Sequence, residues 1–258
     1  MTRDQTPAPV PQSQPGALEE DGTARPASAR VSSAWMDGRI IEKDHPDGSS
    51  VRLRMHVPDR PHMRPGQHYL IRLRAPDGYT AQRSYSVASD DDDPLLEFLI
   101  ERLPDGEVSS FLADVAEVGD ELELRGPIGR WFVWDGQQRA LCVVGGTGVV
   151  PAISMLRTAR RRHVADRVQV LAVGRDPSTL PYANELEAAG AHLAFTRHST
   201  TNRAAGPPTA AELKPLTEGK EVVFVCGSGR FAEFAESLLL DVGVAPELIR
   251  VERFGPTM

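Results

Sequence analysis

Cysteine is scarce in this chain, with only Cys142 and Cys226 among 258 residues. Each of the two ends or interrupts an apolar run, which is the usual place of a buried thiol. Two cysteines do not resemble the disulfide framework of a small secreted protein. A plant-type [2Fe–2S] centre needs four cysteine ligands, so this chain cannot hold one alone, and no metal site is predicted.

Long apolar runs and an excess of basic charge are also missing. No run approaches the roughly 18 residues that a membrane span requires, and the N-terminus lacks the apolar region of a signal peptide. We therefore expect no membrane insertion and a cytoplasmic location. The formal net charge is −7, which excludes a general attraction to nucleic acid.

The composition of the chain changes near residue 32. Residues 1–32 are rich in proline and small polar residues, and this composition predicts a disordered tail. Apolar and polar residues then alternate in short segments, which predicts antiparallel strands with one wet face. Closely spaced strands of this kind favour a small barrel over residues 33–136. The predicted strands are 39–43, 50–57, 68–73, 95–101 and 121–125, the last broken by Gly126–Gly129, with a short helix at 108–114.

After Asp135-Gly136 the pattern becomes an alternation of apolar strands and helices. This alternation predicts a parallel sheet covered on both faces, so residues 137–258 form the second predicted domain. The predicted strands are 140–144, 168–173, 193–196 and 221–226, and the predicted helices are 151–162, 182–189, 209–213 and 230–241.

A glycine-rich turn follows the first strand of the second domain. Gly145-Gly146-Thr147-Gly148 opens the helix predicted from Pro151. Glycines let the backbone approach a diphosphate, and a helix N-terminus favours its negative charge. The spacing differs from G-x-G-x-x-G, so a tight strand-to-helix turn without a ligand is an equal alternative.

Arg83-Ser84-Tyr85-Ser86 lies in the first domain. Alternate residues of a strand share a face, so Arg83 and Tyr85 lie on one face and the two serines on the other. The arginine can bind a phosphate bidentately, and the tyrosine ring can lie against an isoalloxazine. An edge strand with solvated side chains is the alternative. The turn Gly106–Ser109 opens the short helix, where free amides could hold a phosphate oxygen.

Cys226-Gly227 follows the last central strand at its carboxyl end. Open α/β sheets bind ligands at that edge. The thiol of Cys226 could therefore touch a nicotinamide ring, and a buried packing residue is the alternative.

These motifs, in this order, resemble the ferredoxin–NADP reductase superfamily. The resemblance covers residues 33–258, through Pro65–His68, Arg83–Ser86, Gly106–Ser109, Gly126–Gly129, Gly145–Pro151, Tyr182–Leu186 and Cys226-Gly227. It implies an antiparallel Greek-key barrel that binds FAD, followed by a parallel-sheet α/β domain that binds NAD(P)H.

The resemblance also implies roles for single residues. Arg83 would bind the FAD pyrophosphate, and Gly106, Val108 and Ser109 of the helix turn would continue the phosphate contact. Ser84 of the same motif is counted among the FAD-binding residues. Tyr85 would stack on the isoalloxazine. Ser86 near flavin N5, Cys226 beside the nicotinamide and Phe254 as the C-terminal flavin cover would form the catalytic set. The nucleotide would be held by Gly146, Thr147, Gly148, Cys226 and Gly227.

Three arginines bear on the choice between NADPH and NADH. Arg175, Arg197 and Arg203 follow strand ends and could meet a ribose 2′-phosphate, whereas Asp176 leaves a 2′-hydroxyl site open. A mild preference for NADPH is predicted.

Two charge clusters remain. We interpret Asp90–Asp93 as a solvated loop. The basic residues at 157 and 160–163 lie along a helix and beyond its end, and a solvated face is preferred to a docking patch for an acidic ferredoxin.

The predicted function is that of an FAD-dependent NAD(P)H reductase. Electrons would pass from the nucleotide through the flavin to a separate protein, such as a ferredoxin, an oxygenase or another redox enzyme. A reductase of free flavin or quinone is the alternative enzyme, and a redox-silent flavin-binding subunit is the alternative from another class.

Overall fold

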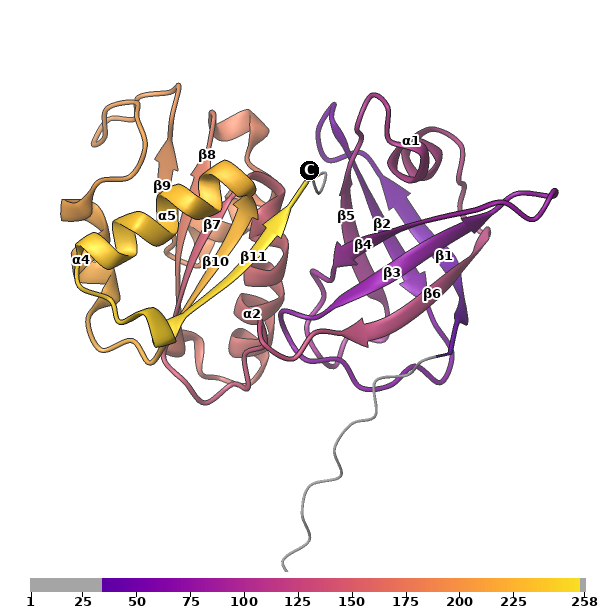
Figure 1. Ribbon diagram of the computed structural model, residues 1–258, viewed down its shortest axis with the longest axis horizontal. Helices are drawn as coiled ribbons and strands as arrows, with labels where there is room; N and C mark the ends of the chain where they lie inside the picture. The colour runs from indigo at the N-terminus through magenta and orange to yellow at the C-terminus, as the bar shows by residue number, and fades with distance from the viewer. Residues whose placement is uncertain (1–33, 256–258) are drawn as a thin grey trace, which may run out of the picture. The chain divides into compact units, whose positions relative to one another are not determined.

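The structure of the chain is a computed structural model that describes residues 34–255 (Figure 1). The proline-rich tail predicted over residues 1–32 lies outside the described residues. The described chain contains a six-stranded antiparallel sheet followed by a five-stranded parallel sheet. This arrangement confirms the predicted fold class of a barrel-like sheet followed by an α/β domain.

The antiparallel sheet is curled into a barrel. Apolar residues at alternate positions face its core, and Ile40, Leu53 and Ile71 are completely buried there. Beyond the last residue of one edge strand, the amide of Ala88 donates to the carbonyl of Glu97 on the other edge at 2.8 Å, which brings the two edges together. The strands are β1 (Met36–Asp44), β2 (Ser50–His56), β3 (His68–Arg74), β4 (Thr80–Ser86), β5 (Leu96–Glu101) and β6 (Glu121–Ile128), in the order β4-β3-β6-β1-β2-β5.

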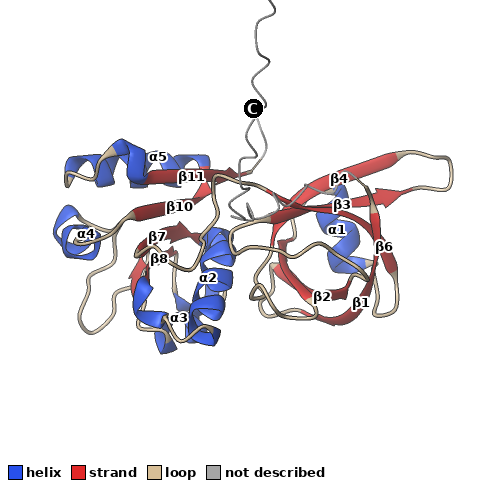
Figure 2. Cartoon of the chain, turned by 90° about the horizontal axis from the view of Figure 1, so that it is seen from below, coloured by secondary structure: helices blue, strands red, loops and turns tan. Residues whose placement is uncertain are grey.

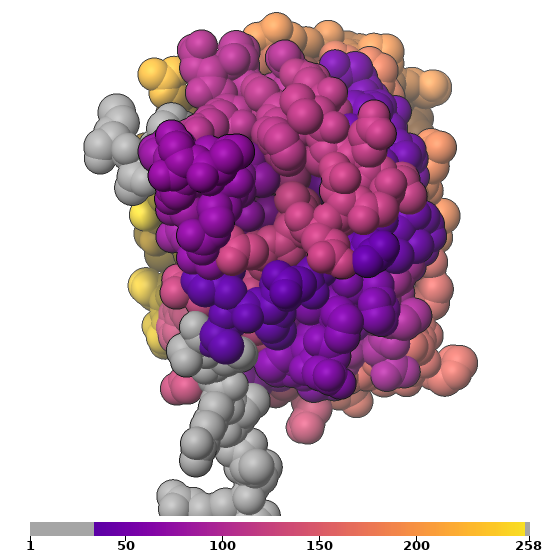
Figure 3. Space-filling view, turned by 90° about the vertical axis from the view of Figure 1, so that its right-hand side faces the viewer, coloured from indigo at the N-terminus to yellow at the C-terminus, as the bar shows by residue number. Residues whose placement is uncertain are grey.

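Strand β6 does not break at Gly126, as the sequence suggested, but continues to Ile128, which pairs with His68 on β3. A Cβ on Gly126 would lie 2.5 Å from the ring of Tyr69, so the glycine serves close packing rather than a turn. Helix α1 (Glu107–Asp114) connects β5 to β6 close to its predicted bounds. Figure 3 shows the barrel side of the molecule, whose surface is formed mainly by residues of the first half of the chain.

The parallel sheet has helices on both faces (Figure 2). Alternate residues of each strand face opposite sides, so Cys142 and Val170 pack toward α2, while Leu141 and Val143 belong to the cluster that includes α5 residues. The strands are β7 (Ala140–Gly145), β8 (Val168–Gly174), β9 (His192–Phe195), β10 (Val222–Ser228) and β11 (Ile249–Phe254), in the order β11-β10-β7-β8-β9. Helices α2 (Val149–Arg161) and α3 (Ala183–Ala188) cover one face, and α4 (Ala210–Thr217) and α5 (Gly229–Asp241) cover the other.

Two features of this domain differ from expectation. Helix α2 begins at Val149, two residues before Pro151, and a short 3₁₀ turn over Gly146–Gly148 precedes it. Pro151 therefore falls in the first turn, where its missing N–H leaves no hydrogen bond unmade. Strand β11 was not predicted, because its charged residues obscure the apolar alternation of an edge strand.

The predicted domain boundary between residues 136 and 137 lies in the connection from β6 to β7. Within residues 34–255, none of the helices combines the length and the apolar character needed to cross a membrane.

Candidate functional site

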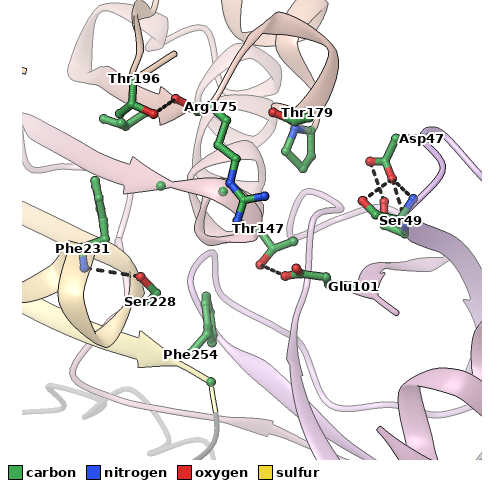
Figure 4. Close-up of a pocket in the computed structure, with 17 residues that line it drawn as sticks. Asp47, Ser49, Glu101, Thr147, Arg175, Thr179, Thr196, Ser228, Phe231 and Phe254 are labelled. Atoms are coloured by element: carbon green, nitrogen blue, oxygen red, sulfur yellow. Dashed lines mark hydrogen bonds between the residues drawn. The ribbon is translucent and has the colours of Figure 1, made fainter. Parts of the chain in front are cut away.

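A cleft of about 650 Å³ lies at the carboxyl ends of the parallel strands (Figure 4). The turns after β7 and β8 form one wall, and the end of β10, the start of α5 and the last residues of β11 form another. The barrel contributes residues of the β1–β2 turn and the end of β5. Its lining includes Gly146, Thr147, Arg175, Thr196, Ser228, Phe231 and Phe254 from the α/β domain and Asp47, Ser49 and Glu101 from the barrel.

The glycine turn after β7 packs directly on the end of β10. A Cβ on Gly148 would lie 2.3 Å from the carbonyl oxygen of Cys226, so a side chain does not fit there. No side chain caps this turn or the start of α2, which leaves amides at a positive helix end for an anionic group. The turn therefore has the backbone cradle that a diphosphate needs.

Glu101 faces this turn and was not singled out from the sequence. The hydroxyl of Thr147 donates to its Oε2 at 3.4 Å (Figure 4). A carboxylate at the end of a strand looks like any solvated acid in the sequence. Only the packing of the barrel against the α/β domain brings it to the cleft.

The three arginines predicted for nucleotide choice fall into two groups. Arg175 lines the cleft, and the amide of Arg197 donates to the carbonyl of Arg175 at 2.9 Å, which places the two residues side by side. Arg203 instead binds within its own loop. Its guanidinium pairs with Glu212 at 2.6 Å and donates to the carbonyl of Pro207 at 2.8 Å. The pairing with Arg203 lowers the pKa of Glu212 to about 2.

Asp176 serves the local turn. Its carboxylate accepts hydrogen bonds from the amides of Ser178 and Thr179 at 3.0 and 3.2 Å. The hydroxyl of Ser178 also donates to this carboxylate at 2.6 Å, and this bond is the largest cause of the lowered pKa of Asp176. This carboxylate caps the 3₁₀ turn over Pro177–Thr179, which is an ordinary structural use of aspartate.

The four residues of the Arg83–Ser86 motif on strand β4 become more buried from the first to the last. Arg83 and Ser84 are exposed, and the guanidinium of Arg83 has one hydrogen bond among the described residues, to the carbonyl of Gln82 at 2.7 Å. Tyr85 is half-buried, and burial raises its pKa to about 12. Ser86 is 5% exposed, and its hydroxyl has no hydrogen-bond partner within residues 34–255.

An unpaired buried hydroxyl is costly, so the Ser86 side chain fits a site where a bound group supplies the missing partner. The polar edge of an isoalloxazine is such a group. The residues of β4 therefore fit a flavin.

At the turn before α1, no side chain caps the backbone amides, whereas the hydroxyl of Ser109 is hydrogen-bonded within the turn. Gly106 precedes the helix, and no side chain caps this end. The hydroxyl of Ser109 donates to the carbonyl of Gly106 and accepts from the amide of Leu103, both at 3.2 Å. Val108 is completely buried. A phosphate contact at this turn would therefore use backbone amides.

Cys226 does not expose its thiol at the cleft. The residue is completely buried on the face that α2 covers, and Gly227 beside it is buried as well. Burial raises the pKa of Cys226, and the nearby charge of Glu252 adds to the rise, so the thiol stays protonated. The predicted contact of this thiol with a nicotinamide stays a prediction, and in this structure the thiol has no exposed surface.

Strand β11 supplies two residues beside β10. Phe254 pairs in register with Ser228 and lines the cleft. Glu252 pairs in register with Cys226, and burial raises its pKa to about 7. Glu252 was not predicted as a site residue, because its partial burial follows from the pairing of β11 with β10.

The two charge clusters left as solvated surface in the sequence are in fact paired with one another. Asp91 is 2% exposed and accepts hydrogen bonds from Arg161 and Arg162. Burial by itself would raise the Asp91 pKa, but the two guanidiniums outweigh it and hold the pKa below the ordinary value. The solvated-loop interpretation of Asp91 was therefore wrong, and these two arginines are not free for a docking patch.

Known proteins that resemble this chain include FAD-binding oxidoreductases, as the fit of strand β4 to a flavin suggests. Residues 38–133 match the family described as the oxidoreductase FAD-binding domain. The flavohemoprotein of Bacillus subtilis is 29% identical over 213 residues, which is 77% of this chain and 53% of that protein. The toluate 1,2-dioxygenase electron transfer component of Pseudomonas putida is 28% identical over 200 residues, covering 74% of this chain and 58% of that protein. The chain thus spans little more than half the length of these two relatives.

Solved structures share the fold over nearly the whole described chain. The FAD/NAD-binding domain of a nitric oxide dioxygenase from Vibrio cholerae superposes with a TM-score of 0.76 at 22% identity, covering 86% of this chain and 99% of that one. A ferredoxin NADP+ reductase from Neisseria gonorrhoeae, whose structure contains FAD and NADP, superposes with a TM-score of 0.73 at 20% identity, covering 85% and 98%.

Proposed function

We propose that this chain, which resembles the ferredoxin–NADP reductase superfamily in its motifs and its fold, is an FAD-dependent NAD(P)H oxidoreductase. Its electrons would pass from the nucleotide through the flavin to a separate acceptor protein of the ferredoxin or oxygenase type. The observation that carries this proposal is the cleft that brings the glycine turn, Arg175 and Phe254 together with the end of β5.

On the barrel side, the exposed guanidinium of Arg83 is suited to a diphosphate. The half-buried ring of Tyr85 would cover one face of the isoalloxazine, and Phe254 would shield it from the cleft side. The orphaned hydroxyl of Ser86 would find its partner on the polar edge of the ring system. Bound FAD would supply the exchange between a two-electron donor and a one-electron acceptor.

On the nucleotide side, the amides of Gly146–Gly148 and the hydroxyl of Thr147 would hold the pyrophosphate. Arg175 and Arg197 would meet a 2′-phosphate, so NADPH is the proposed donor. The engagement of Asp176 in its own turn supports this choice. The remaining task of the chain is to align the two ring systems and exclude water, since a hydride donor needs no general acid or base.

The test is to purify the full chain, add FAD and titrate it anaerobically with NADPH. We expect a bound yellow chromophore that bleaches. Reduction of a [2Fe–2S] ferredoxin is then compared with reduction of free FMN and menadione at equal concentrations. Tyr85→Ala is the matched variant and should lose flavin affinity by tenfold or more, since a stacked aromatic ring contributes about 1–3 kcal/mol in analogous base stacking.

Failure to retain flavin, or a bound flavin that neither NADPH nor NADH bleaches, would refute the proposal, and bleaching by NADH alone would refute only the choice of NADPH. Faster turnover of FMN or menadione than of the ferredoxin would instead identify a small-molecule reductase.

A further inference from the structure

One face of α2 is hydrogen-bonded to the segment that directly follows strand β4. The hydroxyl of Ser154 donates to the carbonyl of Ser89 at 2.7 Å, and the hydroxyl of Thr158 accepts from the amide of Asp91 at 3.3 Å. Ser154 and Thr158 are both completely buried. Residues four apart lie on one helix face, so two successive turns of α2 are bonded to residues 88–91.

Glu97 on β5 is the centre of a second set of bonds between the same two parts of the chain. It is 6% exposed. Its Oε1 accepts a hydrogen bond from the hydroxyl of Tyr182 at 2.8 Å and lies 3.1 Å from Nη1 of Arg157. Arg157 in turn holds Glu185 through two hydrogen bonds of 2.9 Å. Burial raises the pKa of Tyr182, so its phenol remains a donor.

The backbone of Tyr182 is itself constrained. Its φ is 57° and its ψ is 24°, the left-handed conformation that residues with a side chain rarely adopt. Such conformations persist where the surroundings hold them in place, and they gather at functional sites. Here the hydrogen bond to Glu97 and the packing of the ring in the core below α2 hold the residue.

The bonded segments lead directly to the two sites of the proposed function. Helix α2 starts at the glycine turn, and Ser154 is six residues, or about 9 Å of helix, beyond Gly148. The segment 88–91 starts two residues after Ser86. A change in how α2 meets the barrel would therefore move the nucleotide turn relative to the flavin strand.

We propose that Glu97, Arg157 and Tyr182 are positioning residues that set the distance and angle between the nucleotide site and the flavin site; this inference rests on the proposed function. Apolar contacts already hold the two parts together, because Ala88, Leu99 and Trp134 of the first part share one buried cluster with α2. Apolar contacts are not directional, whereas hydrogen bonds restrict the distance and the angle between the two groups. The apolar cluster thus holds α2 against the first part of the chain, and the buried polar contacts fix the orientation of the two.

The test compares Tyr182→Phe with Tyr79→Phe in the full chain. Tyr79 offers a matched control, since its hydroxyl donates to Glu107 at 3.0 Å, a tyrosine–glutamate bond within the barrel. Each FAD-loaded protein is mixed anaerobically with NADPH to obtain the limiting rate of flavin reduction and the nucleotide Kd. Hydrogen–deuterium exchange of residues 88–91 is measured in the flavin-free protein.

For Tyr182→Phe we expect a limiting rate at least tenfold lower, a Kd within twofold of wild type, and at least tenfold faster exchange at residues 88–91. A displacement of about 1 Å is enough for such a loss of rate. Tyr79→Phe should match wild type in all three. Arg157→Lys keeps the charge but loses the fork that spans Glu97 and Glu185, and it serves as the second variant if Tyr182→Phe fails to fold.

Faster exchange with an unchanged rate would reduce these residues to structural ones and overturn the proposal, as would unchanged exchange. A wild type that neither NADPH nor NADH reduces would refute the proposed function, and it would overturn the alignment role too. The exchange measurement would still report on the bonds between α2 and residues 88–91, so the two failures are distinguishable.

Discussion

The backbone amide of Arg197 donates a hydrogen bond to the carbonyl oxygen of Arg175 at 2.9 Å, which joins the ends of β9 and β8. Two exposed guanidinium side chains thereby start from neighbouring points at the rim of the cleft. Neither forms an ion pair with a carboxylate among residues 34–255. We therefore propose this pair as the place that would meet the ribose 2′-phosphate of NADPH.

Removal of either guanidinium should change nucleotide choice. A charge-assisted hydrogen bond contributes about 1.5–3 kcal/mol, so Arg175→Ala and Arg197→Ala should each raise the KM for NADPH roughly tenfold or more. The KM for NADH should change less than twofold. Arg160→Ala removes an exposed charge at the far end of α2 and controls for net charge. Steady-state kinetics with both nucleotides decide the matter, and a wild type that prefers NADH would contradict the assignment.

Ser86→Ala should separate stability from catalysis. The wild-type hydroxyl is buried without a partner, so its removal should leave the flavin-free protein equally stable or more stable by about 1 kcal/mol. The FAD-loaded variant should keep its flavin but be reduced by NADPH about tenfold more slowly. Ser237→Ala, at an exposed serine of α5 outside the proposed flavin and nucleotide sites, is the control. Urea unfolding and anaerobic stopped-flow measurements give the two quantities, and an unchanged reduction rate would place Ser86 away from the reacting edge.

Glu252 should make the stability of the flavin-free protein depend on pH. Burial raises its pKa from the ordinary 4.5 to about 7, so the folded chain binds more protons than the unfolded chain between these values. The free energy of unfolding should therefore fall as pH rises through this window. Glu252→Gln should remove that part of the fall and be the more stable protein at pH 8, by at most about 3 kcal/mol.

The measurement for Glu252 is chemical unfolding at pH 5, 6, 7 and 8. Glu236→Gln, a substitution at a half-exposed carboxylate on α5, serves as the control and should follow the wild-type curve closely. A glutamine variant at position 252 with the wild-type pH slope would show that Glu252 ionises without cost.

Gly148→Ala should damage the nucleotide turn more than Gly146→Ala. The three atoms nearest to an added methyl group at 148 are backbone atoms of Cys226 and Gly227, the closest at 2.3 Å, so the turn and β10 must move apart. Overpacking of this kind costs about 1–3 kcal/mol. At Gly146 the methyl group meets nothing within 4 Å, and only its φ of 57° is unfavourable, by roughly 1–2 kcal/mol.

The unfolding midpoint in urea and the KM for NADPH compare the two alanine variants. We expect the KM to rise far more for Gly148→Ala. Equal effects at both positions would mean that the approach of the turn to β10 does not shape the site.

The sequence by itself was enough to establish the two kinds of sheet, because a strand's apolar periodicity is a local property. Alternation predicted the barrel strands, and continuous apolar runs such as Leu141–Val144 predicted the parallel ones. The glycine turn and the Arg83–Ser86 motif were visible for the same reason, since a turn or a strand face needs only neighbouring residues. The edge strand β11 escaped because its charged residues Arg250, Glu252 and Arg253 obscure the apolar alternation.

The tertiary structure alone decided which charged and polar groups meet. Asp91 and Arg161 are 70 positions apart in sequence, and only the docking of α2 on the barrel turns two apparently solvated clusters into ion pairs with a buried carboxylate, that of Asp91. The same docking brings Glu101 to Thr147, across 46 positions. Arg203, which the sequence grouped with Arg175 and Arg197, is held by Glu212 of the following helix. The free energy of a charged contact depends on distance and burial, and neither quantity is set by residues that are adjacent in the chain.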